Sequence, residues 1–239
     1  MLPCVILAGG LATRMRPLTE QLPKSLIPVA GRPFLFHQLE WLRQQGVTNV
    51  ILSIGHLGAQ IRSALAGAGD LGVRIQFVDE GEELRGSGGA LCLALREGLL
   101  PAAFFLLNGD SYLVLDLARV EAAWSDSGLP ALMTVYRNEG RWDRSNVRFD
   151  EGAVYYDKHA PRETRAEMPW IDYGMSILTS DAVAEWCPAD GKGDVADLLH
   201  GLSAKGLVAG YVATERFFEI GSPSGLQDLE HHLETKEHK

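Results

Sequence analysis

Short apolar runs alternate with segments of helical period along the first half of this chain. The apolar runs are rich in β-forming residues, whereas the longer segments repeat apolar residues at spacings of three and four. This alternation is typical of a mostly parallel sheet covered by helices. The expected strands are 4–7, 50–54, 73–78, 104–107 and 132–136. The expected helices are 34–45, 58–65, 89–96 and 117–125.

The pattern changes after Arg137. Two β-rich segments, 146–149 and 153–156, flank Asp150-Glu151-Gly152, which predicts a hairpin and its turn. A further strand is expected over 171–178. The second half therefore predicts a smaller antiparallel element beside the parallel sheet.

Two more helices are indicated by capping residues. Asp194 precedes an amphipathic segment, and Ser222 with Pro223 has the character of an N-cap followed by a first helical residue. Since no linker rich in Pro, Gly or Ser separates the two halves, we expect one domain over 1–239, divided into halves 1–137 and 138–239. The predicted fold is α/β and Rossmann-like, with a mostly parallel central sheet flanked by helices.

Composition and the N-terminus exclude several classes of protein. The 239 residues are 46% hydrophobic and contain 26 glycines, but no Gly-X-Y period or Gly/Ser tract accounts for the glycine. The longest uncharged apolar stretch, 99–107, is far shorter than the roughly 18 residues needed to cross a membrane. No leader-like segment opens the chain. We expect a cytoplasmic globular protein that does not enter a membrane.

The charge is unevenly distributed. The net charge of −9 argues against nucleic acid as a partner, yet residues 1–32 carry four basic residues against one acidic residue. This segment predicts a local anion site. The three cysteines, Cys4, Cys92 and Cys187, show no metal-ligand spacing, and we expect buried free thiols.

The strongest chemical signal follows the first strand. Paired glycines in Leu7-Ala8-Gly9-Gly10 let backbone N–H groups approach a phosphate, because no Cβ blocks the approach. Arg14 adds a guanidinium fork and Lys24 a compact cation. An ordinary turn with solvated basic residues is the alternative, but the full pattern is more specific than a lone Gly-Gly pair.

Residues 5–33 resemble the signature of sugar-1-phosphate nucleotidylyltransferases. The motif L-A-G-G-x-x-x-R-x-x-P is followed here by P-K-x-x-x-P-V-x-G-x-P. The resemblance implies that Leu7-Ala8-Gly9-Gly10 wraps a nucleoside triphosphate and that Arg14 and Lys24 are catalytic, balancing charge at the reacting phosphates. The first half of the domain would then bind the nucleotide and the second half the sugar phosphate.

A second glycine cluster follows the third strand. Glu80 stands upstream of Gly86-Ser87-Gly88-Gly89, which is similar to the base-recognition loop of that family. A carboxylate accepts from ring N–H donors of a base, and glycine backbone lets a flat ring lie close. We predict nucleotide binding by Glu80, Gly86, Ser87 and Gly89, although the glycines could simply open a helix.

Two acids are predicted to bind Mg²⁺. Asp110 follows the fourth strand, at the end of the sheet where open α/β proteins place ligands. The resemblance implies that this aspartate holds the metal, and that Glu219, which stands where the family usually has aspartate, is the second acid, either as a direct ligand or through a water. Mg²⁺ takes few protein carboxylates together with phosphate oxygens. Alternatively, Asp110 is an ordinary residue of an Asn-Gly-Asp turn, and Glu219 is a charge at the rim of the molecule before an N-cap.

The sugar phosphate is expected to contact five residues in the family-like segments. Asp157-Lys158 resembles the family's acid-lysine element, in which the lysine meets the phosphate, and the glycine of Ile171-Asp172-Tyr173-Gly174 leaves room for the sugar ring. The predicted sugar-phosphate residues are Asn108, Asp157, Lys158, Asp172 and Gly174.

The resemblance therefore implies an Mg²⁺-dependent enzyme that joins a nucleoside triphosphate to a sugar 1-phosphate and releases pyrophosphate. GTP and UTP both fit an acceptor such as Glu80, with GTP favoured. Nucleotidyl transfer to a non-sugar phosphate such as phosphocholine, or a non-catalytic nucleotide-binding module, stays open. The expected assembly is a monomer or a homodimer.

Overall fold

The computed structural model describes residues 1–12 and 15–237. The chain groups into two compact units that interleave along the sequence. The N-terminal unit comprises Pro3–Leu84, Leu107–Leu113 and Phe217–Lys239. The central unit comprises Met1–Leu2, Arg85–Leu106 and Val114–Arg216. The single nucleotidyltransferase domain with a division at residue 137 stays a prediction.

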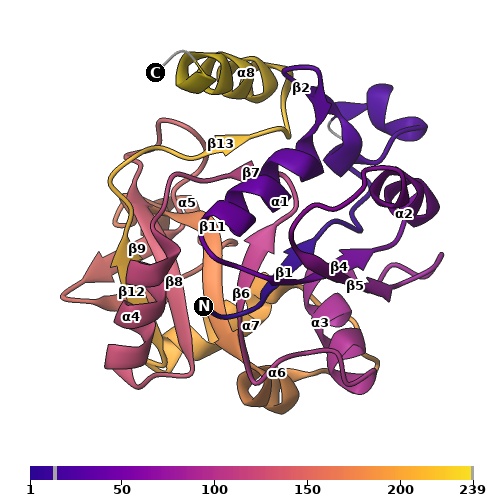
Figure 1. Ribbon diagram of the computed structural model, residues 1–239. Helices are drawn as coiled ribbons and strands as arrows, with labels where there is room; N and C mark the ends of the chain where they lie inside the picture. The colour runs from indigo at the N-terminus through magenta and orange to yellow at the C-terminus, as the bar shows by residue number, and fades with distance from the viewer. Residues whose placement is uncertain (13–14, 238–239) are drawn as a thin grey trace. The chain divides into compact units, whose positions relative to one another are not determined.

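The N-terminal unit contains three parallel strands that lie side by side in Figure 1. Their order is β5-β4-β1, and all but the first residue of β4 is buried, as expected of a strand with neighbours on both sides. The strands are β1 (Cys4–Leu7), β4 (Asn49–Ile54) and β5 (Arg74–Asp79). The helices are α1 (Phe34–Gln44), α2 (Gly58–Ala66) and α8 (Pro223–Glu237).

Two short antiparallel ladders complete this unit. In one, β7 (Ser111–Tyr112) pairs with β13 (Phe218–Glu219), so that Ser111 lies opposite Glu219. In the other, β2 (Pro28–Val29) pairs with β3 (Arg32–Pro33). Two 3-10 turns, Leu18–Glu20 and Lys24–Leu26, precede β2. The pairing of β7 with β13 brings the C-terminal segment beside the residues that follow the fourth predicted strand, a contact that no local sequence pattern predicts.

The central unit holds a mixed sheet with the order β6-β11-β8-β12-β10-β9, in which β9 also pairs with β11. β12 runs parallel to β8, whereas β11 is antiparallel to it. The strands are β6 (Ala103–Asn108), whose last two residues belong to the N-terminal unit, β8 (Ala131–Arg137), β9 (Val147–Asp150), β10 (Ala153–Tyr156), β11 (Trp170–Thr179) and β12 (Val208–Val212). The predicted α/β fold is confirmed, and so is the hairpin, whose turn residues Glu151 and Gly152 have positive φ angles.

The helices of the central unit are mostly capped by side chains. Asp116, Thr179 and Asp194 each accept a hydrogen bond from a first-turn amide. The helices are α3 (Gly86–Arg96), α4 (Leu117–Ser127), α5 (Arg162–Arg165), α6 (Ser180–Trp186) and α7 (Val195–Ala204). The second glycine cluster is the first turn of α3 rather than the loop before it. In the described part of the chain, no helix combines the length and apolar content needed to span a membrane.

The expectation of three free thiols is wrong for two of them. Cys92 of α3 and Cys187 at the end of α6 form a disulfide, with Cα atoms 5.9 Å apart. Their sequence separation of 95 residues means that no spacing argument could predict the packing of α6 on α3. Cys4 is a free buried thiol, as predicted, and burial raises its pKa.

Candidate active site

The glycine-rich turn after β1 is fixed by backbone contacts in the N-terminal unit. The Ala8 N–H donates to Ser53 O at 2.9 Å, which extends the pairing of β1 with β4 by one residue. A Cβ on Gly9 would lie 2.8 Å from Glu80 Oε1, so glycine is needed where this predicted base-binding carboxylate comes close. No heavy atom of the residues that the structure describes would lie within 4 Å of a Cβ on Gly10, which is exposed. Arg14, the predicted catalytic guanidinium, lies outside the described residues.

Lys24 and Asp110 form an ion pair beside this turn. Lys24 Nζ donates to Asp110 Oδ2 at 2.7 Å, and the lysine side chain is only 18% exposed. Gly109 sets the position of the aspartate, because a Cβ there would collide with the Leu7 carbonyl oxygen at the end of β1. The sequence therefore places a cation and a carboxylate together through a turn that only glycine fits.

A buried glutamine supports the same turn. Gln38 of α1 is fully buried, and its Nε2 donates to Asn108 O at 3.0 Å and to Ser111 O at 2.9 Å. These two carbonyls flank Asp110, so α1 fixes the backbone on which the carboxylate stands. Gln38 was not predicted to serve the site. A polar residue on an apolar helix face is the signal that could have identified it.

Glu219 joins the pair from β13. The Ile220 N–H donates to Asp110 O at 3.0 Å, which places the segment after β13 against the predicted metal ligand. Glu219 Oε1 accepts from Ser222 Oγ at 2.6 Å, and Oε2 accepts from the Gly221 N–H. A Cβ on Gly221 would contact Glu219 Oε2 and would lie 2.8 Å from Lys24 Nζ. Lys24, Asp110 and Glu219 therefore form one group of charges, called the Lys24 cluster below.

The glycines at the start of α3 pack on the chain in the central unit. The Gly88 and Gly89 N–H groups both donate to Gly193 O, at 2.9 and 3.2 Å. A Cβ on Gly86, whose φ is +77°, would lie 2.5 Å from the same oxygen. Close approach of residues 191–194 is thus one reason for this glycine cluster, and these two amides are already occupied.

The carboxylate of Asp194 connects Lys158 to the first turn of α3. Lys158 Nζ donates to Asp194 Oδ2 at 2.6 Å, and Ser87 Oγ donates to Asp194 Oδ1 at 2.8 Å. Burial alone would raise the pKa of Asp194, but the hydrogen bonds from Ala196 N, Lys158 and Ser87 lower it below its usual value. The sequence predicted Asp194 only as a helix cap.

The positive charge of Lys158 acts on the carboxyl group of Asp172. Asp172 Oδ1 accepts from Gly174 N at 2.9 Å, across a bulge in β11 where Gly174 has a φ of +101°. Burial raises the pKa of Asp172 to about 6, and the hydrogen bond from Gly174 and the charge of Lys158 oppose this shift. Ser87, Lys158, Asp172 and Asp194 are called the Lys158 cluster below.

Asp157 and Asn108 have local backbone roles in the structure. Asp157 Oδ1 accepts from His159 N at 2.8 Å, whereas the Asn108 carbonyl receives Gln38. Among the described residues, the predicted site residues thus divide between the units. The N-terminal unit holds Leu7, Ala8, Gly9, Gly10, Lys24, Glu80, Asn108, Asp110 and Glu219. The central unit holds Gly86, Ser87, Gly89, Asp157, Lys158, Asp172 and Gly174.

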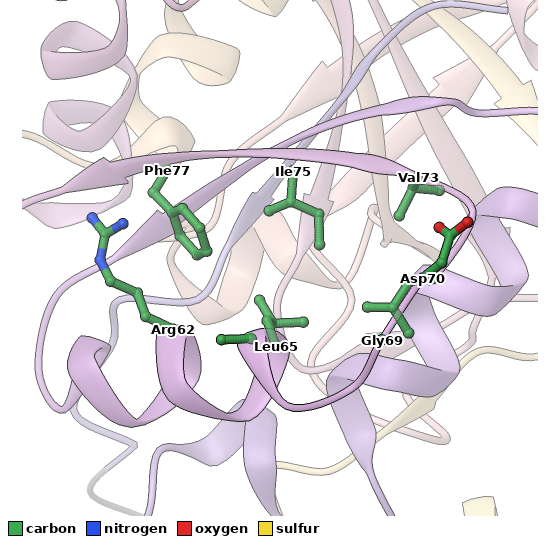
Figure 2. A pocket seen from close by; sticks show the side chains of 9 residues that line it. Arg62, Leu65, Gly69, Asp70, Val73, Ile75 and Phe77 are labelled. Atoms are coloured by element: carbon green, nitrogen blue, oxygen red, sulfur yellow. The ribbon is translucent and has the colours of Figure 1, made fainter.

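A separate pocket of about 280 Å³ lies between α2 and β5. Figure 2 shows Leu65 of α2 facing Ile75 and Phe77 of β5, with Arg62 at one end. The Arg62 guanidinium lies over the Phe77 ring at 4.2 Å and pairs with Asp79 at 3.1 Å. None of the predicted site residues that the structure describes lines this pocket.

Comparison with known proteins identifies the family to which this chain belongs. A family model described as a MobA-like NTP transferase domain matches residues 4–207. The D-glycero-alpha-D-manno-heptose 1-phosphate guanylyltransferase of Campylobacter jejuni is 27% identical over 177 residues, which cover 74% of this chain and 76% of that protein. The catalytic subunit beta of a mannose-1-phosphate guanylyltransferase from Drosophila pseudoobscura is 43% identical over 110 residues, or 44% of this chain. The match spans only 29% of that longer relative.

The fold is shared with solved structures. The crystal structure of HddC from Yersinia pseudotuberculosis has a TM-score of 0.78 at 24% identity, covering 98% of this chain and all of that one. This likeness supports the fold, and the family match confirms the resemblance read from the glycine-rich motif.

Proposed function

We propose, on the premise that this chain belongs to the family of MobA-like NTP transferase domains, that it makes a nucleoside diphosphate sugar from a nucleoside triphosphate and a sugar 1-phosphate. The observation that carries the proposal is the Lys24 cluster. A glycine-rich turn, a cation and two carboxylates come together there, as a triphosphate and its counter-ion require.

The proposed reaction is an in-line displacement. An oxygen of the sugar 1-phosphate forms a bond to the α-phosphorus, the bond from that phosphorus to the bridging oxygen breaks, and pyrophosphate leaves. No general base is needed, because a phosphate monoester is already ionised near neutral pH. Catalysis then rests on positioning and on neutralising charge.

The Lys24 cluster would receive the triphosphate. Gly9 and Gly10 present backbone to it without a Cβ in the way, and Lys24 stabilises negative charge on the transferring and leaving phosphates. Arg14 is assigned the same task by its place in the motif. Lys24 is held by Asp110 at 2.7 Å, so its ammonium is already positioned at the turn.

The donor set of this cluster fits Mg²⁺. Asp110 and Glu219 offer hard carboxylate oxygens from two segments joined by the hydrogen bond from Ile220 N to Asp110 O, and Mg²⁺ is commonly held by one or two carboxylates with phosphate oxygens. No group of three or more His, Cys, Asp or Glu residues suited to a metal occurs in the described chain, so a resident all-protein metal cage is not what it offers. When bound with the triphosphate, Mg²⁺ would neutralise charge on the phosphate oxygens.

The Lys158 cluster would receive the sugar 1-phosphate. Lys158 would supply the cation for its phosphate, and Asp172, on whose carboxyl group the charge of Lys158 acts, would accept hydrogen bonds from sugar hydroxyls. The base is assigned as guanine, with GTP as the substrate, because relatives such as the heptose 1-phosphate enzyme are named guanylyltransferases and Glu80 can accept from guanine N–H groups. UTP is the alternative substrate. We propose the cytoplasm as the location of the protein.

A pyrophosphate-release assay tests the function. Four nucleoside triphosphates are each combined with mannose, glucose and heptose 1-phosphates and with phosphocholine, with and without Mg²⁺. We expect release with GTP and one sugar 1-phosphate, and loss of release in Lys24→Ala. Arg119→Ala, which removes the partner of the exposed Asp116 pair, is the matched control and should keep full activity.

Three outcomes point elsewhere. Release with phosphocholine alone would replace the sugar substrate. Triphosphate binding that is indifferent to Mg²⁺ in thermal-shift measurements, without release, would favour a nucleotide-binding module. Full turnover by Lys24→Ala would overturn the role assigned to the Lys24 cluster.

A further inference from the structure

One carboxylate in the central unit holds two side chains predicted to bind different substrates. Asp194 accepts from Lys158 Nζ through Oδ2 at 2.6 Å and from Ser87 Oγ through Oδ1 at 2.8 Å. The sequence assigns the lysine to the sugar phosphate and the serine to the nucleotide. The position of both side chains therefore depends on where Asp194 lies.

Asp194 itself is fixed by the first turn of α7. Its Oδ1 also accepts from Ala196 N at 3.0 Å, and Ser87 Oγ accepts from Val195 N at 2.9 Å. The serine and the aspartate thus hold the N-terminus of α7 together. The neighbouring Gly193 carbonyl in turn receives two amides from α3. Asp194 is a fixed point joined to two helices.

Lys158, by contrast, is a long side chain that is 47% exposed. An unpaired lysine at such exposure would populate many rotamers, and ordering it would weaken phosphate binding. The ion pair uses one of the three ammonium donors and leaves two for phosphate oxygens. The partial positive charge at the N-terminus of α7 offsets part of the carboxylate's charge.

We propose that Asp194 is a positioning residue for the sugar 1-phosphate, which it serves by anchoring Lys158 beside the first turn of α3. This inference rests on the proposed function, since Lys158 is the phosphate ligand there. A plain helix cap is the competing role. The two differ because a cap acts on α7 alone, whereas a positioning residue acts through Lys158.

Asp194→Asn separates the two roles. Asparagine is as good an N-cap as aspartate and keeps an oxygen for Ala196 N and Ser87, but it loses the charge that holds Lys158. Asp116→Asn is the matched control, because Asp116 caps α4 through Arg119 N at 3.2 Å and pairs with the Arg119 side chain at 3.3 Å. Neither of those contacts involves a predicted site residue.

In steady-state kinetics with the best substrate pair, we expect Asp194→Asn to raise KM for the sugar 1-phosphate about tenfold and to leave KM for the triphosphate within about twofold. In a Lys158→Ala background the same change should have no further effect. An unchanged or lower KM in the single variant, or a full effect in the Lys158→Ala background, would overturn the proposal. Asp116→Asn should match the wild type.

A chemical readout works without turnover. The rate at which an amine-acylating reagent modifies Lys158, measured by peptide mass spectrometry, should rise about threefold in Asp194→Asn, the scale set by the loss of an exposed ion pair. Asp116→Asn should leave it unchanged. If no substrate pair releases pyrophosphate, the proposed function is wrong, but the acylation rate still tests whether Asp194 holds Lys158. An unaltered rate in Asp194→Asn shows that Asp194 does not hold Lys158.

Discussion

The Lys24 cluster and the Lys158 cluster are built from the same parts but divide the work differently. In each, a serine hydroxyl lies between a carboxylate and the first turn of a helix. Ser222 Oγ donates to Glu219 and accepts from Gly225 N at 3.1 Å, and Ser87 Oγ donates to Asp194 and accepts from Val195 N. In each, a lysine is paired to a carboxylate at 2.6 to 2.7 Å.

The difference lies in how the lysine and serine contacts are distributed over the carboxylates. In the Lys158 cluster, Asp194 alone meets both the lysine and the serine, whereas in the Lys24 cluster Asp110 meets the lysine and Glu219 meets the serine. Because the lysine and the serine contact different carboxylates in the Lys24 cluster, that pair of carboxylates can hold a divalent cation and keep a charge for the lysine. One carboxylate committed to a lysine and a helix cap suits the orientation of a phosphate ligand instead.

The largest effect is expected at Asp110. Asp110→Asn removes a proposed metal ligand and the partner of Lys24 in one isosteric change, and we expect pyrophosphate release to fall about 10³-fold. The measurement is kcat/KM at several Mg²⁺ concentrations. Asp116→Asn, in an exposed ion pair, is the control. Activity above a tenth of wild type at any Mg²⁺ concentration contradicts the role of Asp110.

A smaller effect is expected at Lys158. Lys158→Ala removes charged hydrogen bonds to one substrate only, so KM for the sugar 1-phosphate should rise about 30-fold while KM for the triphosphate stays nearly constant. Lys205→Ala, at the exposed C-terminal end of α7, serves as the control. Equal changes in both KM values would show that the two clusters do not divide the substrates as proposed.

The two aspartates near Lys158 should respond to pH in opposite directions. The pKa of Asp172 is raised to about 6, so the folded state holds a proton that the unfolded state has lost between about pH 4 and 6, and stability falls as the pH rises through that window. Asp172→Asn should therefore increase the free energy of unfolding by about 1–3 kcal/mol at pH 7 and by little at pH 4.

Asp194 is the internal comparison for that experiment. Its pKa is lowered, so its contribution is present above its unfolded value, near 4, and is lost as the pH falls through the folded value. Because the side chain is 40% exposed, we expect Asp194→Asn to destabilise at pH 7 by less than about 1 kcal/mol. Denaturant unfolding at pH 4 and pH 7 measures both, and the same sign at pH 7 for the two variants would refute the assignment.

The smallest effects are expected at the two serines. Ser222→Ala and Ser87→Ala each remove a helix-capping hydroxyl, at a cost of about 1 kcal/mol of unfolding free energy. The two variants should differ in their kinetics. Ser87 donates to Asp194, which holds Lys158, whereas Ser222 donates to Glu219. We expect Ser87→Ala to affect mainly KM for the sugar 1-phosphate and Ser222→Ala mainly the Mg²⁺ concentration that is required. A uniform loss in both variants would indicate stability effects alone.

The sequence predicted local structure best where one segment decides it. The strand at Cys4–Leu7, the hairpin around Asp150-Glu151-Gly152 and the caps at Asp194 and Ser222 follow from residues within a few positions of one another. The family was also readable, because the glycine-rich motif and its lysine lie within residues 5–33. The roles of single site residues stay predictions.

The partners in contacts between distant segments had no sequence signal. The Cys92–Cys187 disulfide spans 95 residues, Gln38 reaches the carbonyls beside Asp110 from α1, and the first turn of α3 packs on Gly193. In each case the packing of helices and strands determines the partner, which residue spacing in the sequence cannot predict.

What the sequence by itself determined is therefore the α/β fold, the family and the types of charged group available for phosphate. What only the tertiary structure decided is which charge meets which. Lys24 pairs with Asp110 from 86 residues away, and Lys158 pairs with Asp194 from 36 residues away. The physical reason is that a carboxylate becomes a lysine's partner through the backbone that positions it, and that backbone is placed by burial and hydrogen bonds formed far away along the chain.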